Sequence, residues 1–138
     1  RILLLASLLF LFAGCGGTYV DSPKNFQRAF GQQPPKEARI VHSYYWLSPH
    51  FTHEHEYFFE VENASNVVSM LTNGLPLSRR SNDAWSRPDG NNVPKWFVPK
   101  ERDSYEAWTW RTNGPYQSSF LMLRDKSDGR VFIHDQQL

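Results

Sequence analysis

Residues 105–136, YEAWTWRTNGPYQSSFLMLRDKSDGRVFIHDQ, decide the fold because they predict three strands in quick succession. The strands are expected at Tyr105–Thr112, Tyr116–Arg124 and Arg130–Gln136. Asn-Gly at 113–114 and Asp-Gly at 128–129 separate them, and these dipeptides favour hairpin turns because they accept positive φ. The C-terminal part of the chain is therefore expected to be an antiparallel β-meander.

Two further strands are expected upstream of the meander. Ala38–Leu47 is rich in β-branched and aromatic residues, and His53–Glu62 alternates between two kinds of side chain. One face of the second strand would carry His53, His55, Tyr57, Phe59 and Val61, and the other Glu54, Glu56, Glu60 and Glu62. This pattern predicts one packed face and one solvated face of glutamates.

Two helices complete the expected domain. Ser22-Pro23 would open a short one that places Phe26 and Phe30 on one face and ends at Gly31. Asn63 would cap a second helix through Asn73, with Gly74 as a left-handed stop. Its apolar stripe predicts packing on a sheet face: Val67, Val68, Met70 and Leu71. The expected class is α+β, an antiparallel sheet of about five strands with a C-terminal β-meander and two helices, one packed on a sheet face.

The segment from Leu77 to Asp103 is expected to be a long polar loop. Loops of this length are uncommon in compact domains and are either functional or mobile. Two of its arginines and its two tryptophans belong to residue types enriched among binding hot spots: Arg79, Arg80, Trp85 and Trp96. These four are the candidate partner-binding residues.

Within this loop stands Pro94, Trp96, Phe97 and Pro99, which matches the pattern P-x-W-[WF]-x-P. In this segment the chain resembles a loose group of small uncharacterised bacterial proteins and lipoproteins, and the resemblance implies a fold but no activity. Two prolines around two aromatic residues make a stiff extended segment. A buried clasp of the loop is favoured over a binding surface, because large aromatic side chains are mostly buried.

The opening stretch, RILLLASLLFLFAGC at residues 1–15, predicts export and lipidation. Its apolar run is shorter than the roughly 20 residues of a membrane-spanning helix, but it suits the h-region of a signal peptide. Phe12, Ala13, Gly14 and Cys15, the chain's only cysteine, resemble the lipobox of bacterial lipoproteins. The resemblance implies a signal peptide at 1–14, a diacylglycerol on Cys15, a tether at 15–21 and one domain at 22–138. An uncleaved anchor and an ordinary secretory signal are the alternatives.

The expected location follows from the same resemblance. Gly16 after the cysteine implies, in a Gram-negative host, export to the outer membrane with the domain facing the periplasm. The net charge is +1 and falls to zero when Arg1 leaves with the signal, which gives no electrostatic case for nucleic acid. The expected partners are the membrane, through the anchor, and an envelope protein.

The strongest chemical pattern is His50-x-x-His53-x-His55, because the last two imidazoles share a strand face and could chelate a divalent metal. Histidines at the exposed end of a strand are the favoured interpretation, and no cofactor is expected. We find no nucleophile elbow, HExxH or phosphate-binding glycine loop. The sequence thus predicts a non-catalytic binding or envelope-associated module, with a metal-binding protein as the first alternative and a hydrolase as the second.

Overall fold

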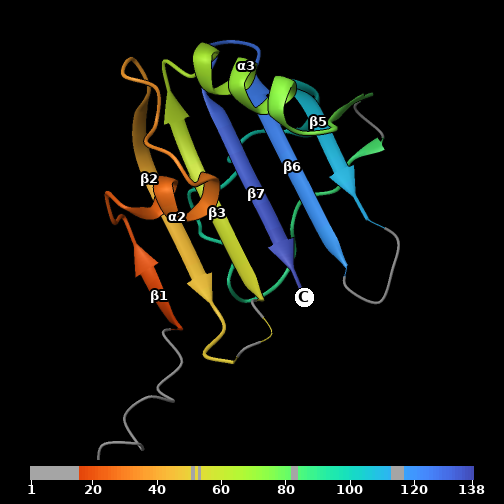
Figure 1. Cartoon of the computed structure of the whole chain (residues 1–138). Coiled ribbons are helices and arrows are strands. Elements are labelled where there is room, and N and C mark those ends of the chain that lie inside the picture. The colour runs from red at the N-terminus through yellow and green to blue at the C-terminus, as the bar shows by residue number, and fades with distance from the viewer. Residues whose placement is uncertain (1–15, 51, 53, 82–83, 113–116) are drawn as a thin grey trace, which may run out of the picture.

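The computed structural model describes residues 16–50, 52, 54–81, 84–112 and 117–138. Within them the chain forms one antiparallel sheet of seven strands in the order β1-β2-β3-β7-β6-β5-β4 (Figure 1). Along the chain the strands are β1 (Gly17–Val20), β2 (Arg39–Leu47), β3 (His55–Glu62), β4 (Ser78–Arg80), β5 (Tyr105–Arg111), β6 (Ser118–Asp125) and β7 (Val131–Gln137). The predicted antiparallel sheet with a C-terminal meander is confirmed, but the expected number of about five strands is too low.

Both additional strands lie at the edges of the sheet. Residues 17–20, expected to be tether, pair with the end of β2, with Gly17 opposite Leu47. Residues 78–80, expected to be loop, pair with β5, and all three are exposed. Short edge strands lack the two-sided apolar pattern of a central strand, which is why the sequence does not reveal them.

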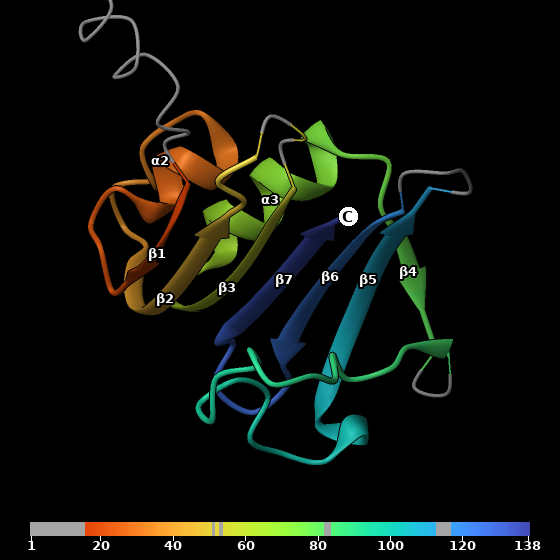
Figure 2. The same ribbon diagram turned by 90° about the horizontal axis from the view of Figure 1, so that it is seen from below.

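Two α-helices of the described residues, α2 (Asn25–Phe30) and α3 (Ser65–Gly74), lie on the same face of the sheet (Figures 1 and 2). Phe26 of α2 lies edge-on to Phe59 of β3, with 5.7 Å between the ring centroids. Val67 and Leu71 of α3 belong to the same buried cluster. The prediction that the second helix packs on a sheet face is confirmed, and the first helix joins it there.

The observed helix ends agree only in part with those predicted from the sequence. Gly31 ends α2 in the left-handed region at φ 71°, as expected. Gly74 lies inside α3, and Leu75, in an extended conformation, follows it, so the predicted left-handed stop is wrong. Asn63 has a φ of 52° and precedes Ala64, which occupies the N-cap position in its place.

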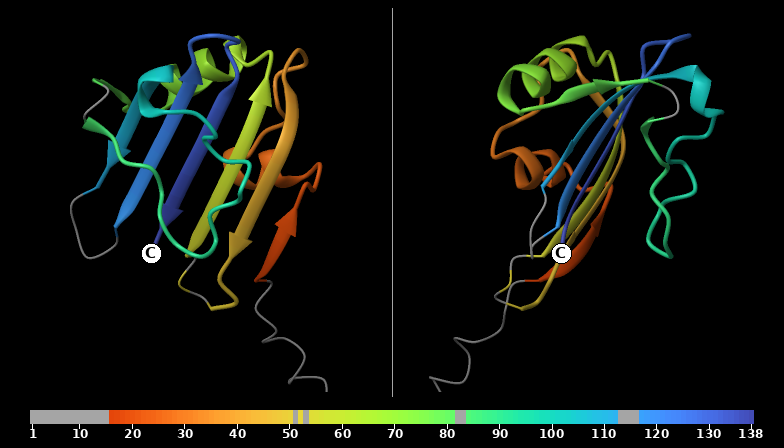
Figure 3. Two further views of the ribbon diagram at one scale, coloured as in Figure 1. Left: turned by 180° about the vertical axis from the view of Figure 1, so that it is seen from behind. Right: turned by 90° about the vertical axis from the view of Figure 1, so that its right-hand side faces the viewer.

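The other face of the sheet is covered by residues 84–101, which cross it as a long loop (Figure 3). Trp85, Phe97 and Val98 of this loop are buried against Phe58 and Phe132 of the sheet in a second apolar cluster. The loop is followed by a 3₁₀ turn, Arg102–Ser104, which leads into β5. Phe97 and Val98 are buried and Trp96 is half-buried, as expected for a clasp.

Covering this face changes the environment of the glutamates of β3. Only 7% of Glu56 and 5% of Glu60 is exposed, so the predicted solvated row is wrong for these two residues. The alternation itself is correct, because Tyr57, Phe59 and Val61 all lie in the cluster under the helices. An apolar/polar period locates the two faces of a strand, but it does not show that a distant loop covers the polar one.

Candidate functional site

A cleft of about 540 Å³ lies between the start of the long loop and the sheet. The loop side is formed by residues 84–89, and Arg80 of β4 borders it. The floor is formed by one end of β5, β6 and β7, through side chains that include Thr109, Arg111, Ser119, Leu121, His134 and Gln136. Because alternate residues of each strand face the loop, the cleft receives polar side chains from three neighbouring strands.

Among the described residues, three arginines line the cleft, and Asp89 is the acidic residue beside them. Arg80 donates through Nε to Thr109 Oγ1 at 2.8 Å, and Arg87 donates through Nη2 to the backbone carbonyl of Lys100. Arg111 is exposed at the end of β5 and has no polar partner within the described part of the chain. Since a guanidinium carries five N–H donors, each of the three retains donors for a ligand. The cleft is therefore suited to an anion.

Trp85, which lines the cleft, carries a buried donor without a partner in the described ranges. Its side chain is 3% exposed, and its indole Nε1 has no hydrogen-bond acceptor among the described residues. The ring is held edge-on to Tyr105, with centroids 6.3 Å apart, and Arg102 lies 5.4 Å from its centroid. A buried N–H without a partner costs about 1–3 kcal/mol, so such groups are rare in folded proteins.

A buried histidine–glutamate pair lies at the back of the cleft. His134 Nε2 of β7 lies 3.2 Å from Glu56 Oε1 of β3, and Asn92 Nδ2 approaches the other carboxylate oxygen at 3.4 Å. The imidazole stacks on Phe58, with 4.5 Å between the ring centroids. A carboxylate that orients an imidazole is one half of an acid–base catalytic group. Within the described residues, no hydroxyl group hydrogen-bonds to His134.

The structure separates the four residues predicted to bind a partner. Arg80 and Trp85 both line the cleft. Arg79 lies on the opposite face of β4, where it pairs with Glu106 and lies 5.8 Å from the Trp108 ring centroid. Trp96 stacks on His42 at 5.3 Å and is not among the cleft residues. Because Trp85 is 3% exposed, it offers no exposed contact surface.

The structure describes two of the three histidines predicted as metal ligands. His50 is exposed in the β2–β3 turn, where its backbone N–H donates to Ser48 Oγ at 3.1 Å. His55 Nε2 lies 2.9 Å from Asp135 Oδ2 on the helix-covered face, and His53 lies outside the described residues. No group of three or more histidine, cysteine, aspartate or glutamate residues in the described ranges has the geometry of a metal site. The metal-binding alternative stays a prediction.

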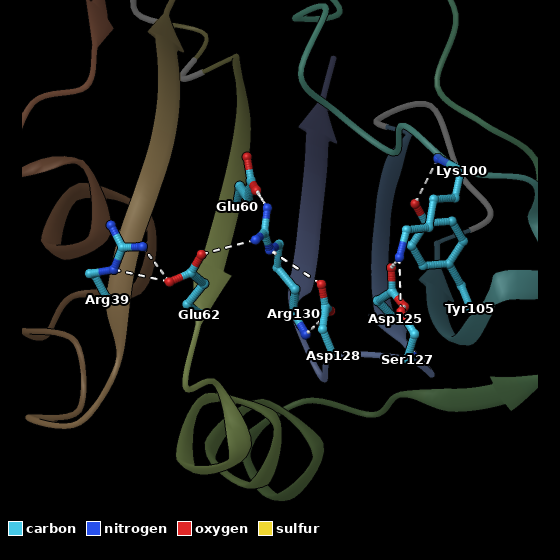
Figure 4. Close-up of polar contacts among 9 residues, drawn as sticks. All are labelled: Arg39, Glu60, Glu62, Lys100, Tyr105, Asp125, Ser127, Asp128 and Arg130. Carbon is cyan, nitrogen blue, oxygen red and sulfur yellow. Dashed lines mark hydrogen bonds and ion pairs between the residues drawn. The ribbon is translucent and has the colours of Figure 1, made fainter.

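A group of ion pairs lies at the opposite end of the same sheet face (Figure 4). Arg130 pairs with both Glu60 and Glu62, and Glu62 also pairs with Arg39. The hydrogen bond to Glu60 raises the pKa of Arg130 above its already high ordinary value. These contacts give the buried carboxylate of Glu60 its counter-charge.

The end of the long loop is fixed by a second set of contacts in Figure 4. Lys100 Nζ lies 2.7 Å from Asp125 Oδ2, and the Lys100 backbone N–H donates to the Tyr105 hydroxyl at 3.0 Å. Burial by itself would raise the pKa of Asp125, but the hydrogen bonds from Lys100 and Ser127 outweigh it and lower the pKa to about 2. These contacts fix the position of Lys100, and its backbone carbonyl accepts the hydrogen bond from Arg87.

The sequence indicated part of this site. Arg80 and Trp85 are predicted through residue type, whereas Arg111 is assigned to a strand of the meander and given no binding role. Only the strand order brings β5, β6 and β7 to one side of the loop, and no local pattern encodes that order.

In the part of the chain that the structure describes, no helix combines the length and the apolar character needed to cross a bilayer. Comparison with protein-family models, with curated proteins and with solved structures finds no match for this chain.

Proposed function

We propose that this chain is a lipid-anchored, non-catalytic binding module of a bacterial cell envelope, and that its cleft holds a ligand with an anionic group. The anchor is the diacylglycerol on Cys15 that the lipobox resemblance implies. In a Gram-negative host the domain faces the periplasm from the outer membrane. The ligand is carried by an envelope component, in keeping with the membrane and envelope-protein partners expected from the sequence.

One observation carries the choice of ligand: among the described residues, three arginines line the same cleft. Arg80, Arg87 and Arg111 each have free donors, and guanidinium groups bind carboxylate and phosphate through paired N–H bonds. Like charges gathered around one cavity repel one another, so an anion stabilises the group. The cleft volume of about 540 Å³ lies within the range usual for small-molecule sites.

The test is to titrate the mature domain with inorganic phosphate and with citrate. The NMR signal of the Trp85 indole N–H reports binding. We expect one of the two anions to shift this signal with saturation. Arg111→Gln should weaken binding about tenfold, because a hydrogen bond to a charged group is worth about 1.5–3 kcal/mol. Trp85→Phe, which keeps an aromatic ring but removes the indole N–H, identifies the signal.

The matched control is Arg124→Gln, which removes an arginine from β6 outside the cleft. It should leave anion affinity unchanged. If neither anion shifts the Trp85 signal in a folded protein, or if Arg124→Gln weakens binding as much as Arg111→Gln, the anion site is refuted.

A further inference from the structure

The cleft and the point where the chain enters the sheet lie at the same end of the sheet. Consecutive strand partners form one row across it: Gly17, Leu47, His55, Gln137 and Ser118. Arg111 pairs with Ser119, one residue further in. β1 and β5 are five strand spacings apart, so Gly17 and Arg111 lie about 24 Å apart along this end. Figure 1 shows β1 beginning at the end where β7 finishes.

The chain has almost no slack between Cys15 and the sheet. β1 begins at Gly17, and two residues span at most about 7 Å. Gly16 is packed against the β2–β3 turn, since a Cβ placed on it would lie 2.3 Å from Pro49 N and Cα. A lipid on Cys15 therefore holds this end of the sheet at the bilayer surface, where a long flexible tether would leave the orientation free.

The cleft continues to that end of the sheet. A second polar hollow of about 460 Å³ adjoins it and shares Arg111, Ser119 and Gln136 with it. Its remaining residues include Gln117, Ser118 and Leu138, which lie in or beyond the row that contains Gly17. Polar side chains thus line a continuous path from the sheet end to the arginines.

We propose that the cleft binds the headgroup phosphate of an anionic phospholipid in the same bilayer that carries the anchor. This inference rests on the proposed function, because it assumes both the lipid on Cys15 and an anion in the cleft. A phosphodiester matches the guanidinium fork of Arg111, which lines both the cleft and the adjoining hollow. The anchor keeps the cleft beside a high local concentration of headgroups, which compensates for weak intrinsic affinity.

The experiment uses the mature lipidated protein in nanodiscs of phosphatidylcholine, with or without phosphatidylglycerol. We expect phosphatidylglycerol to shift the Trp85 indole signal and to reduce the apparent affinity for added inorganic phosphate by about tenfold, through competition for one site. Arg111→Gln should abolish the lipid-dependent shift, and Arg124→Gln should retain it.

A gadolinium-labelled lipid in the same nanodiscs tests the orientation. The amide signals of Gln117, Ser118 and Leu138 should broaden, while those of Asp128 and Gly129 should stay sharp. The second pair lies in the β6–β7 turn at the other end, about 23 Å away along a strand of seven residues. Equal broadening at both ends would overturn the orientation and the inference with it.

The remaining outcomes separate the two proposals. If inorganic phosphate binds the cleft and phosphatidylglycerol neither shifts Trp85 nor competes, the lipid headgroup is excluded and the anion site stands. If phosphate, citrate and phosphatidylglycerol all leave the cleft unaffected, both proposals fail.

Discussion

Asp125 is the residue whose ionisation most directly couples pH to the long loop. Its pKa is lowered to about 2, so its contribution to stability is complete above its ordinary pKa of 3.8 and is lost as the pH falls through about 2. The shift corresponds to about 2 kcal/mol by linkage, which solvent around the half-exposed Lys100 reduces to about 1 kcal/mol. We expect the native protein to lose about this much more free energy of unfolding than Asp125→Asn between pH 5 and pH 2.

The measurement is urea denaturation of both proteins across that range, since other carboxylates titrate equally in the two and cancel in the difference. A Lys100→Met variant should remove most of the same pH-dependent difference, because it removes the partner. Parallel curves for the native protein and Asp125→Asn would show that the pair contributes nothing.

At the scale of elements, the sequence predicts the strands and helices that carry a local pattern and misses those that depend on tertiary pairing. The three strands of the meander, the two central strands and both helices were predictable, because each carries a local period or a turn dipeptide. β1 and β4 were not, because at a sheet edge their pairing depends on β2 and β5 rather than on their own residues. The cleft depends on the same tertiary order, so residue type alone identified Arg80 and not Arg111.

The burial of Glu56 follows from the long loop as an element. Phe97 clasps the loop to the sheet through edge-on contacts with Phe58 and Phe132, at centroid distances of 5.0 and 5.9 Å. We expect Phe97→Ala to lower the free energy of unfolding by about 3 kcal/mol, in the usual range for truncating a buried phenylalanine. Lys95→Ala, at an exposed position of the same loop, should change it by less than about 0.5 kcal/mol.

Urea denaturation of the two variants makes this comparison, with hydrogen exchange of the β7 amides as a second readout. The β7 amides should exchange faster in Phe97→Ala only. A loss below about 1 kcal/mol would contradict the clasp, because the loop would then cover the face without stabilising it.

For the whole molecule, membrane attachment should depend on one atom, the sulfur of Cys15. Two or more acyl chains, at about 0.8 kcal/mol per buried methylene, hold a protein stably on a bilayer. In a bacterial host that matures lipoproteins, we expect Cys15→Ser to lose labelling by radioactive palmitate and to leave the membrane fraction. Cys15 is the right position to change, because its neighbour Gly16 is packed against Pro49 and replacement of Gly16 would perturb the sheet end itself.

Circular dichroism should show the same sheet signal in both proteins, since the domain folds from β1 onward. Palmitate labelling that persists in the variant would place the lipid elsewhere or exclude it, and the cleft would then have to meet its anion without an anchor on Cys15.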